Sequence, residues 1–82
     1  MARARVRLPL GLVGLMRSET EAAIDEANLG RDDTLIARMY LIDQIPQIDI
    51  GIELDLDRST ISKRLPKILD KVEQTAHRMN IS

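Results

Sequence analysis

The sequence predicts a small all-α domain, and three observations lead to that fold class. The chain has 82 residues, which is the length of one domain. Tyr40 is its only aromatic residue, so the core must consist of aliphatic side chains, Met and Ala, which suits packed helices. These residues recur at helical spacing along most of the chain. A chain this short buries only about 60% of its unfolded surface, so support from a second subunit is expected.

The first 17 residues are expected to form a basic and apolar arm ahead of a helical domain of residues 18–82. In Ala2–Leu8, small or apolar residues alternate with arginine, which is typical of an extended arm or a short edge strand. A disordered basic tail is the alternative interpretation. The alternating arginines are Arg3, Arg5 and Arg7. Leu10–Met16 is too apolar to remain in water and should pack against the domain or a second subunit.

This N-terminal region has the basic start and apolar run of a signal peptide, but not its other features. Pro9, Gly11 and Gly14 interrupt the run, and no small-residue cleavage site comes before Arg17. The run is also far shorter than the roughly 20 residues that span a bilayer. We therefore expect no membrane association. The chain has no Cys, so no disulfide or thiolate site defines its compartment, and the expected location is the cytoplasm.

A first helix is predicted over about 19–29. Ser18 and Glu21 have the spacing of a capping box, in which the two side chains accept hydrogen bonds from free N–H groups at the helix start. Gly30 is a natural stop for this helix. The alternative is a helix that begins near Leu10 and runs through Ser18.

A second helix is predicted to begin with Asp32 or Asp33 as its cap and to reach about Gln44. Its apolar residues recur at helical spacing, and Pro46 follows and ends the element. The predicted apolar face consists of Leu35, Ile36, Met39, Ile42 and Ile45.

Residues 47–66 predict two short helices joined by a tight turn. The first covers Gln47–Leu54, the turn covers 55–57, and Asp57 caps a second helix of about 58–65. Pro66 is expected to end or kink that helix, because proline lacks an N–H and disfavours α geometry at the preceding residue. A final amphipathic helix then covers about 66–79. Its apolar face consists of Ile68, Leu69, Val72, Ala76 and Met79.

The apolar spacing of this region is that of a helix-turn-helix. The residues expected to point inward are Ile50, Leu54, Leu56, Ile61 and Leu65. Gly51 lies between two of them, where a side chain larger than a methyl group would block close approach of the second helix. Such a unit presents its second helix to a DNA groove.

Gln47–Pro66 resembles the helix-turn-helix of phage repressors and Cro-type proteins. It is also similar to region four of bacterial sigma factors and to the DNA-binding ends of resolvases and invertases. The matching features are Gln47 at the start, the small Gly51, Leu56 in the turn and the run Arg58–Leu65. The preceding helix is similar to the supporting helix in sigma-like small regulators of prophages and mobile elements.

The chain departs from this family at two positions. Asp55 stands where the family usually places Gly, and it must adopt a left-handed conformation that Asp tolerates better than most residues. Pro66 is the second departure, and we expect it to shorten the recognition helix.

The resemblance implies a DNA-binding surface on the second helix. With Ile61 and Leu65 inward, the polar residues of Arg58–Arg64 face outward, where Arg and Lys can donate to guanine and Ser can reach bases or phosphates. Gln47 would bind a phosphate at the first helix's N-terminus. The predicted DNA-binding residues are Gln47, Arg58, Ser59, Thr60, Ser62, Lys63, Arg64, Lys67, Lys71, Arg3, Arg5 and Arg7. Lys67 and Lys71 are assigned to the DNA backbone, and the arm arginines to the minor groove.

The net charge of −1 conceals a strong segregation of charge along the chain. Residues 1–17 carry +4, residues 18–56 carry −8, and residues 57–82 carry +3. The positive charge gathers on the predicted recognition helix and at the two ends, which is compatible with nucleic-acid binding. The lack of aromatic residues argues against single-stranded nucleic acid or RNA loops, whose bases usually stack on aromatic rings.

No catalytic, metal or cofactor site is expected. The acids at Asp32–Asp33 and Glu19/Glu21 fit helix caps and exposed helix faces better than a metal or acid–base pair. His77 is the only His, and neither Ser59 nor Ser62 has a base arranged to activate it. We therefore expect a binding protein rather than an enzyme, with no small-molecule ligand.

The leading functional hypothesis is a homodimeric, sequence-specific double-stranded DNA-binding protein, a small transcriptional regulator of bacterial or phage type. One short recognition helix makes few base contacts, and a dimer on a palindrome doubles them. The expected dimer interface comprises Leu12, Leu15, Ile68, Leu69, Val72 and Met79. One alternative is a sigma-like interaction module that contacts the transcription machinery with little DNA sequence preference. Another is an intermolecular ribbon of Arg3–Leu8 that reads DNA.

Overall fold

The computed structural model describes residues 10–81 of the chain. This part is entirely helical, with no strand among the described residues, so the predicted all-α fold is confirmed. Its elements are η1 (Leu10–Leu12), α1 (Arg17–Glu26), α2 (Arg31–Ala37), η2 (Arg38–Ile42), α3 (Gln47–Leu54) and α4 (Arg58–Arg78). η1 is a 3₁₀ turn, and η2 is a π-helical turn that continues α2. The predicted arm of Ala2–Leu8, with Arg3, Arg5 and Arg7, lies outside the described residues.

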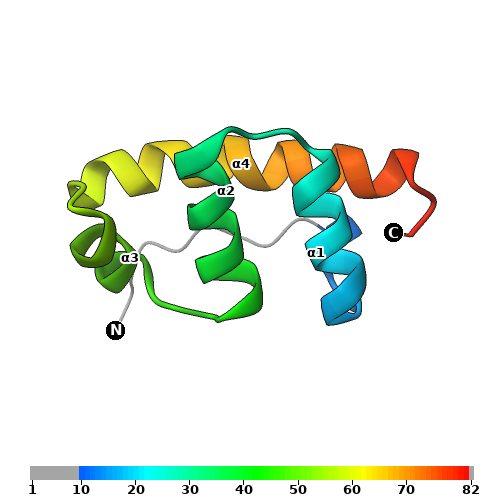
Figure 1. Cartoon of the computed structure of the whole chain (residues 1–82), viewed down its shortest axis with the longest axis horizontal. Coiled ribbons are helices and arrows are strands. Elements are labelled where there is room, and N and C mark those ends of the chain that lie inside the picture. Colours follow the sequence, from blue (N-terminus) through cyan, green and yellow to red (C-terminus); the bar gives the residue numbers. More distant parts are fainter. Residues whose placement is uncertain (1–9, 82) are drawn as a thin grey trace.

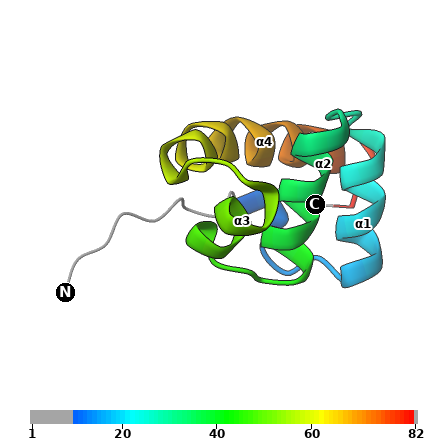
Figure 2. The ribbon, with the colours of Figure 1, turned by 60° about the vertical axis from the view of Figure 1, so that its left-hand side comes forward.

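The long helix α4 organises the domain. Its 21 residues lie along the longest axis of the molecule, and α1, α2 and α3 cross it from one side (Figure 1). α3 packs near the start of α4 and α1 near its end, with α2 between them. The turned view shows the same order, with α3 beneath the first turns of α4 (Figure 2).

The core is an aliphatic stripe of α4 covered by one or two residues from each crossing element. Thirteen apolar side chains among the described residues are buried, and they form one cluster. The α4 members are Ile61, Leu65, Ile68, Leu69, Val72 and Ala76, and the others are Leu12, Ala23, Ile24, Ala27, Ile36, Ala37 and Ile50. Burial of a large aliphatic side chain contributes about 1.5–3 kcal/mol, so this stripe holds the helices together.

Pro66 does not end the helix, so the prediction of two helices over 58–65 and 66–79 is wrong. α4 is one continuous helix with Pro66 inside it, on its exposed surface. An interior proline removes a backbone hydrogen bond and costs about 3 kcal/mol. Buried Leu65 and Ile68 flank it on both sides, and their packing against the crossing helices favours a single helix.

The N-terminal apolar segment packs against the domain itself. Leu12 is 6% exposed, and the Gly11 N–H donates to Glu73 Oε2 of α4 at 2.8 Å. The alternative of a helix from Leu10 through Ser18 is wrong, because a 3₁₀ turn and a short connection separate Leu10 from Arg17. Gly14, with φ of +85°, lies in that connection and reverses the chain direction.

α1 begins earlier than predicted, and Ser18 is not its cap. Met16 is the N-cap, and its N–H donates to Glu19 Oε1 at 2.8 Å, while Thr20 Oγ1 donates to the Met16 carbonyl at 3.2 Å. Gly30 is not the stop of this helix either. The helix ends at Glu26, and Asn28, with φ of 56°, is the left-handed residue that follows it.

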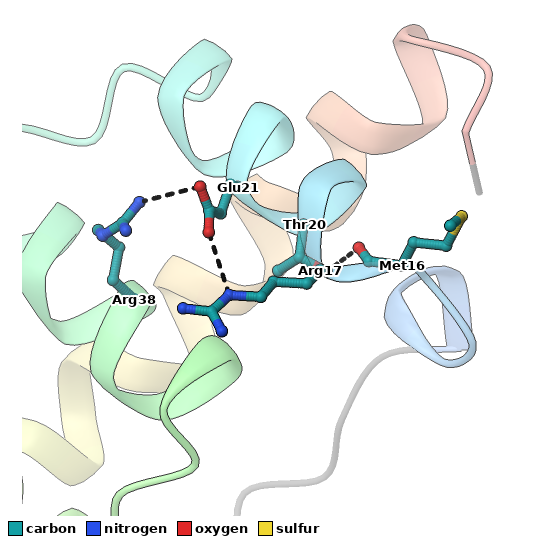
Figure 3. A network of polar contacts seen from close by, with 5 residues as sticks. All are labelled: Met16, Arg17, Thr20, Glu21 and Arg38. Atoms are coloured by element: carbon teal, nitrogen blue, oxygen red, sulfur yellow. Dashed lines mark hydrogen bonds and ion pairs between the residues drawn. The ribbon is translucent and has the colours of Figure 1, made fainter.

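Glu21 of α1 lies between two arginines, Arg17 of the same helix and Arg38 of η2 (Figure 3). Its carboxylate oxygens are 3.3 Å from Arg17 Nε and 4.0 Å from Arg38 Nη1. Exposed ion pairs of this kind contribute only about 0–1 kcal/mol each, so the pair orients α1 against η2 without dominating its stability.

The second helix begins at Gly30 as its N-cap, so neither Asp32 nor Asp33 caps it. Both aspartates lie in its first turn, where their negative charge still favours the helix dipole. Leu35, which belongs to the predicted apolar face, is 41% exposed and does not pack against the core. Ile36 is fully buried, and the other three members pack against the core while remaining partly exposed. The helical region ends at Ile42 rather than near Gln44, which is left-handed.

In the described part of the chain, no helix has the length and apolar character needed to cross a membrane.

Candidate nucleic-acid interface

The connection between α3 and α4 is a tight turn at the predicted place. α3 covers Gln47–Leu54, and Asp55 is left-handed with φ 57° and ψ 46°. The N–H of Leu56 donates to the Gly51 carbonyl at 2.8 Å, and that of Asp55 to the Ile52 carbonyl at 3.3 Å. This pair of bonds is a Schellman motif, which satisfies the last carbonyls of α3 and turns the chain toward α4.

Gly51 is required by the turn more than by the second helix. A Cβ atom at this position would lie 2.7 Å from the Leu56 carbonyl oxygen and 3.8 Å from Ile61 Cγ1. The first distance is shorter than a carbon–oxygen contact allows, and the oxygen belongs to the backbone. Even a methyl group would therefore displace the turn, which is a stricter requirement than the sequence predicted.

Asp57 precedes α4 in an extended conformation, with φ −62° and ψ 146°, so it occupies the predicted N-cap position. Its side chain makes no capping hydrogen bond to the helix, however. The structure therefore supports the position of the cap but not its expected hydrogen bond.

The first half of α4 presents the predicted division into an inner and an outer side. Ile61 and Leu65 are fully buried, and Thr60 is half-buried. The other predicted DNA-binding residues of this helix are exposed: Arg58, Ser59, Ser62, Lys63, Arg64, Lys67 and Lys71. Because α4 continues past Pro66, Lys67 and Lys71 extend the same rigid surface rather than belonging to a separate helix.

Two contacts tie this surface to its neighbours. Ser62 Oγ and Gln47 Oε1 are 3.2 Å apart, and the hydroxyl donates, so two residues assigned to DNA meet across the α3–α4 pair. Arg64 Nη1 lies 3.3 Å from Asp33 Oδ1 of α2, which partly neutralises that guanidinium. The Asp33–Arg64 pair joins residues 31 positions apart, and no local sequence signal could have revealed it.

The remaining cations of this surface face solvent without a carboxylate partner. Within residues 10–81, ion pairs at 4.0 Å or less join Glu21 to Arg17 and Arg38, and Asp33 to Arg64. The exposed basic residues of this predicted DNA-binding surface that are left without such a pair are Arg58, Lys63, Lys67 and Lys71. Lys63, Lys67 and Lys71 recur every four residues and therefore form a positive strip along α4, and Arg58 adds a cation at the start of the helix. All four can donate hydrogen bonds to phosphates or base edges.

An exposed apolar pair on α3 was not predicted from the sequence. Ile48 is 53% exposed and Ile52 is 73% exposed. They border a shallow hollow of about 430 Å³, whose other lining residues are Gly51, Asp55, Leu56, Asp57 and Arg58. A helical projection could have found the pair, because assigning Ile50 and Leu54 to the core leaves Ile48 and Ile52 on another face of α3.

The expected dimer interface requires correction. Leu12, Ile68, Leu69 and Val72 are at most 6% exposed in the single chain, because they form the core that packs η1 and α1 on α4. They are therefore not available to a second subunit. Leu15 and Met79 remain partly exposed, and Val13 and Met16 on either side of Leu15 are exposed.

No group of three or more His, Cys, Asp or Glu side chains with metal-binding geometry occurs within residues 10–81. Comparisons with protein-family models, curated proteins and solved structures gave no match for this chain. Functional inference therefore rests on the chain's own residues and their arrangement.

Proposed function

We propose that this protein binds double-stranded DNA in a sequence-specific manner, with the first half of α4 in the major groove. The observation that carries the proposal is the set of exposed cations on α4, which consists of Arg58 at its start and the strip of Lys63, Lys67 and Lys71, on a helix that begins immediately after a tight turn from α3. A helix N-terminus that follows such a turn is the part that reaches base edges in helix-turn-helix proteins. Arg58 and Lys63 are assigned to bases, and Lys67 and Lys71 to phosphates.

The proposed role is that of a small, cytoplasmic transcriptional regulator of bacterial or phage type that acts as a homodimer. Few side chains of one recognition helix can read bases, and two copies on a palindrome double that number. The proposed dimer contacts are the partly exposed Leu15 and Met79, since the other expected interface residues are in the core. Sedimentation equilibrium with and without a palindromic site tests the dimer.

The central test is selection from random double-stranded DNA at defined salt, followed by binding measurements on the selected site and a scrambled site. Arg58→Ala should cost about 1–3 kcal/mol on the selected site and much less on the scrambled one, because it removes a base contact. Lys71→Ala should weaken both similarly and lower the salt slope by about 1, because it removes a phosphate contact. Gln74→Ala, on the later part of α4, is the control.

Failure to enrich any motif, or an equal loss on both sites for Arg58→Ala, contradicts base reading by α4. Deleting the first nine residues tests the ribbon alternative. Base reading by α4 predicts that specificity survives this deletion with a modest loss of affinity. Reading by Arg3–Leu8 predicts that specific binding disappears.

A second candidate function is an interaction module that contacts the transcription machinery with little DNA sequence preference. The observation that favours it is the exposed pair Ile48 and Ile52 of α3, which lies beside the hollow that Asp55 and Asp57 also line. This function predicts weak binding with nearly equal affinity for the selected and scrambled sites.

A further inference from the structure

The exposed side of α3 combines an apolar centre with a negative border. Ile48 and Ile52 are four residues apart and therefore lie on the same side of the helix, next to the hollow. Single exposed apolar residues are ordinary on a protein surface, but a neighbouring pair beside a hollow is typical of a contact surface.

Exposed carboxylates accompany this pair. Asp49 and Glu53 follow the two isoleucines in sequence, and Asp55 and Asp57 line the hollow together with one cation, Arg58. None of these four is in an ion pair within the described residues. We call this surface the acidic α3 face, and it consists of Ile48, Asp49, Ile52, Glu53, Asp55 and Asp57.

The charge of this face decides which occupant fits it. A second copy placed on it face to face would bring the four carboxylates of each chain against one another, with Arg58 alone to offset them, so this occupant is opposed by like charge. The complementary occupant is a segment that carries several cations and aliphatic residues close together in sequence. Ala2–Leu8 has this chemistry, because it carries three arginines, no acid, and Val6 and Leu8.

The attachment of this segment keeps it close to the face. The Gly11 N–H is bound to Glu73, and Leu12 is buried, so the segment starts from a fixed point on the domain. Nine residues can extend about 30 Å, which is comparable to the 33 Å longest extent of the molecule. A short tether of this kind gives the segment an effective concentration in the millimolar range at the face. Even a weak contact is therefore populated.

We propose that Ala2–Leu8 binds the acidic α3 face of its own chain when no other partner is present. Its three arginines supply the charge that is complementary to the carboxylates, and Val6 and Leu8 supply aliphatic groups for contact with Ile48 and Ile52. Exposed charge pairs are individually weak and are screened by salt, so the contact is reversible. This inference does not rest on DNA binding.

The test uses paramagnetic broadening of NMR signals in the full chain. The sequence has no Cys, so Ala4→Cys supplies a single site for a nitroxide label. The strongest broadening is expected at Ile48 and Ile52, with little at Asn80 beyond the end of α4. Raising the salt to about 1 M, where the Debye length is about 3 Å, should remove the broadening at the face.

Variants test whether the carboxylates are responsible. Asp49→Asn with Glu53→Gln should reduce the broadening at Ile48 and Ile52, because the charges are removed while side-chain size is kept. The matched control is Asp25→Asn with Glu26→Gln, an exposed acidic pair on α1, which should leave the broadening unchanged. Unchanged core signals such as those of Ile24 show that the variants remain folded.

A mixed sample tests whether the segment comes from the same chain or from a second copy. It combines isotope-labelled chains without nitroxide and nitroxide-labelled chains without isotope. No broadening in the mixture supports binding within one chain, whereas broadening at Ile48 and Ile52 shows exchange between copies and overturns the proposal. Broadening spread evenly over exposed residues, or its persistence in the Asp49/Glu53 variant, also overturns it. The experiment contains no DNA, so its failure leaves the proposed function untouched.

Discussion

The two sides of the turn at Asp55–Asp57 carry opposite charge but share one apolar core. Residues 43–57 contain five acids and no Lys or Arg, whereas residues 58–71 contain five basic residues and one acid. Ile50 from the acidic side and Ile61 from the basic side are both fully buried in the same cluster.

This comparison shows that stability and surface charge are organised differently in the molecule. The apolar residues continue across the turn, so neither side can be removed without exposing part of the core. The charges change sign at the turn, so the two sides present surfaces of opposite charge, which suit different partners. Substitutions of buried residues should therefore affect both sides, and substitutions of exposed residues should affect one.

The largest effect is expected from a residue that both sides share. Ile61→Ala should lower the free energy of unfolding by about 3 kcal/mol, because it leaves a cavity beneath the α3–α4 turn. Chemical denaturation measures the loss. Ile52→Ala, on the exposed side of α3, is the control and should change stability little. A loss of similar size for both variants contradicts the assignment of the core.

Pro66→Ala tests the basic side alone. It should raise the free energy of unfolding by about 2 kcal/mol. Alanine supplies the backbone N–H that proline lacks at this position inside α4, and it has a far better helix propensity. Part of the gain is lost because proline also restricts the unfolded chain. Thermal and chemical unfolding measure the change, and a destabilised variant indicates that the helix does not continue through this position.

Gly51→Ala tests the joint between the two sides. The methyl group would meet the Leu56 carbonyl, so a loss of about 1–2 kcal/mol is expected even though alanine favours helices. Gly11→Ala is the matched control, since its methyl group would come equally close to the flexible Glu73 side chain rather than to backbone. The control should lose less, and the opposite order shows that the turn yields more easily than a side chain.

Asp55→Gly and Asp55→Asn separate backbone strain from charge at the same joint. Glycine adopts the left-handed conformation without steric cost, so Asp55→Gly should stabilise the fold by about 1 kcal/mol. Asn removes the same charge but keeps a side chain, and it should have the smaller effect. Equal gains in unfolding experiments assign the effect to charge repulsion among the acids instead.

The local features of the α3–α4 region could be predicted from the sequence because they depend on neighbours along the chain. The bounds of α3 follow from Pro46 before it and the apolar spacing within it. The left-handed residue at Asp55 was expected from the resemblance to helix-turn-helix proteins, which usually have Gly at this position. The inward positions of Ile50, Ile61 and Leu65 follow from helical periodicity alone.

Helix caps were predicted less accurately, because several residues competed for each position. Ser18 was expected to cap the first helix, but the N-cap lies two residues earlier, at Met16, whose N–H donates to the Glu19 carboxylate. At the second helix, Gly30 supplies an unusual backbone angle, with φ of +96°, and displaces both aspartates from the cap.

The sequence by itself determined the helical class, the segregation of charge and the apolar positions of the α3–α4 pair, since these depend on composition and short-range periodicity. Only the tertiary structure decided that α4 continues through Pro66. Residues far apart in the sequence pack along that helix, and their combined burial outweighs the local penalty of one proline. The same packing places Leu12, Ile68, Leu69 and Val72 in the core of one chain, and it leaves Ile48 and Ile52 exposed on α3.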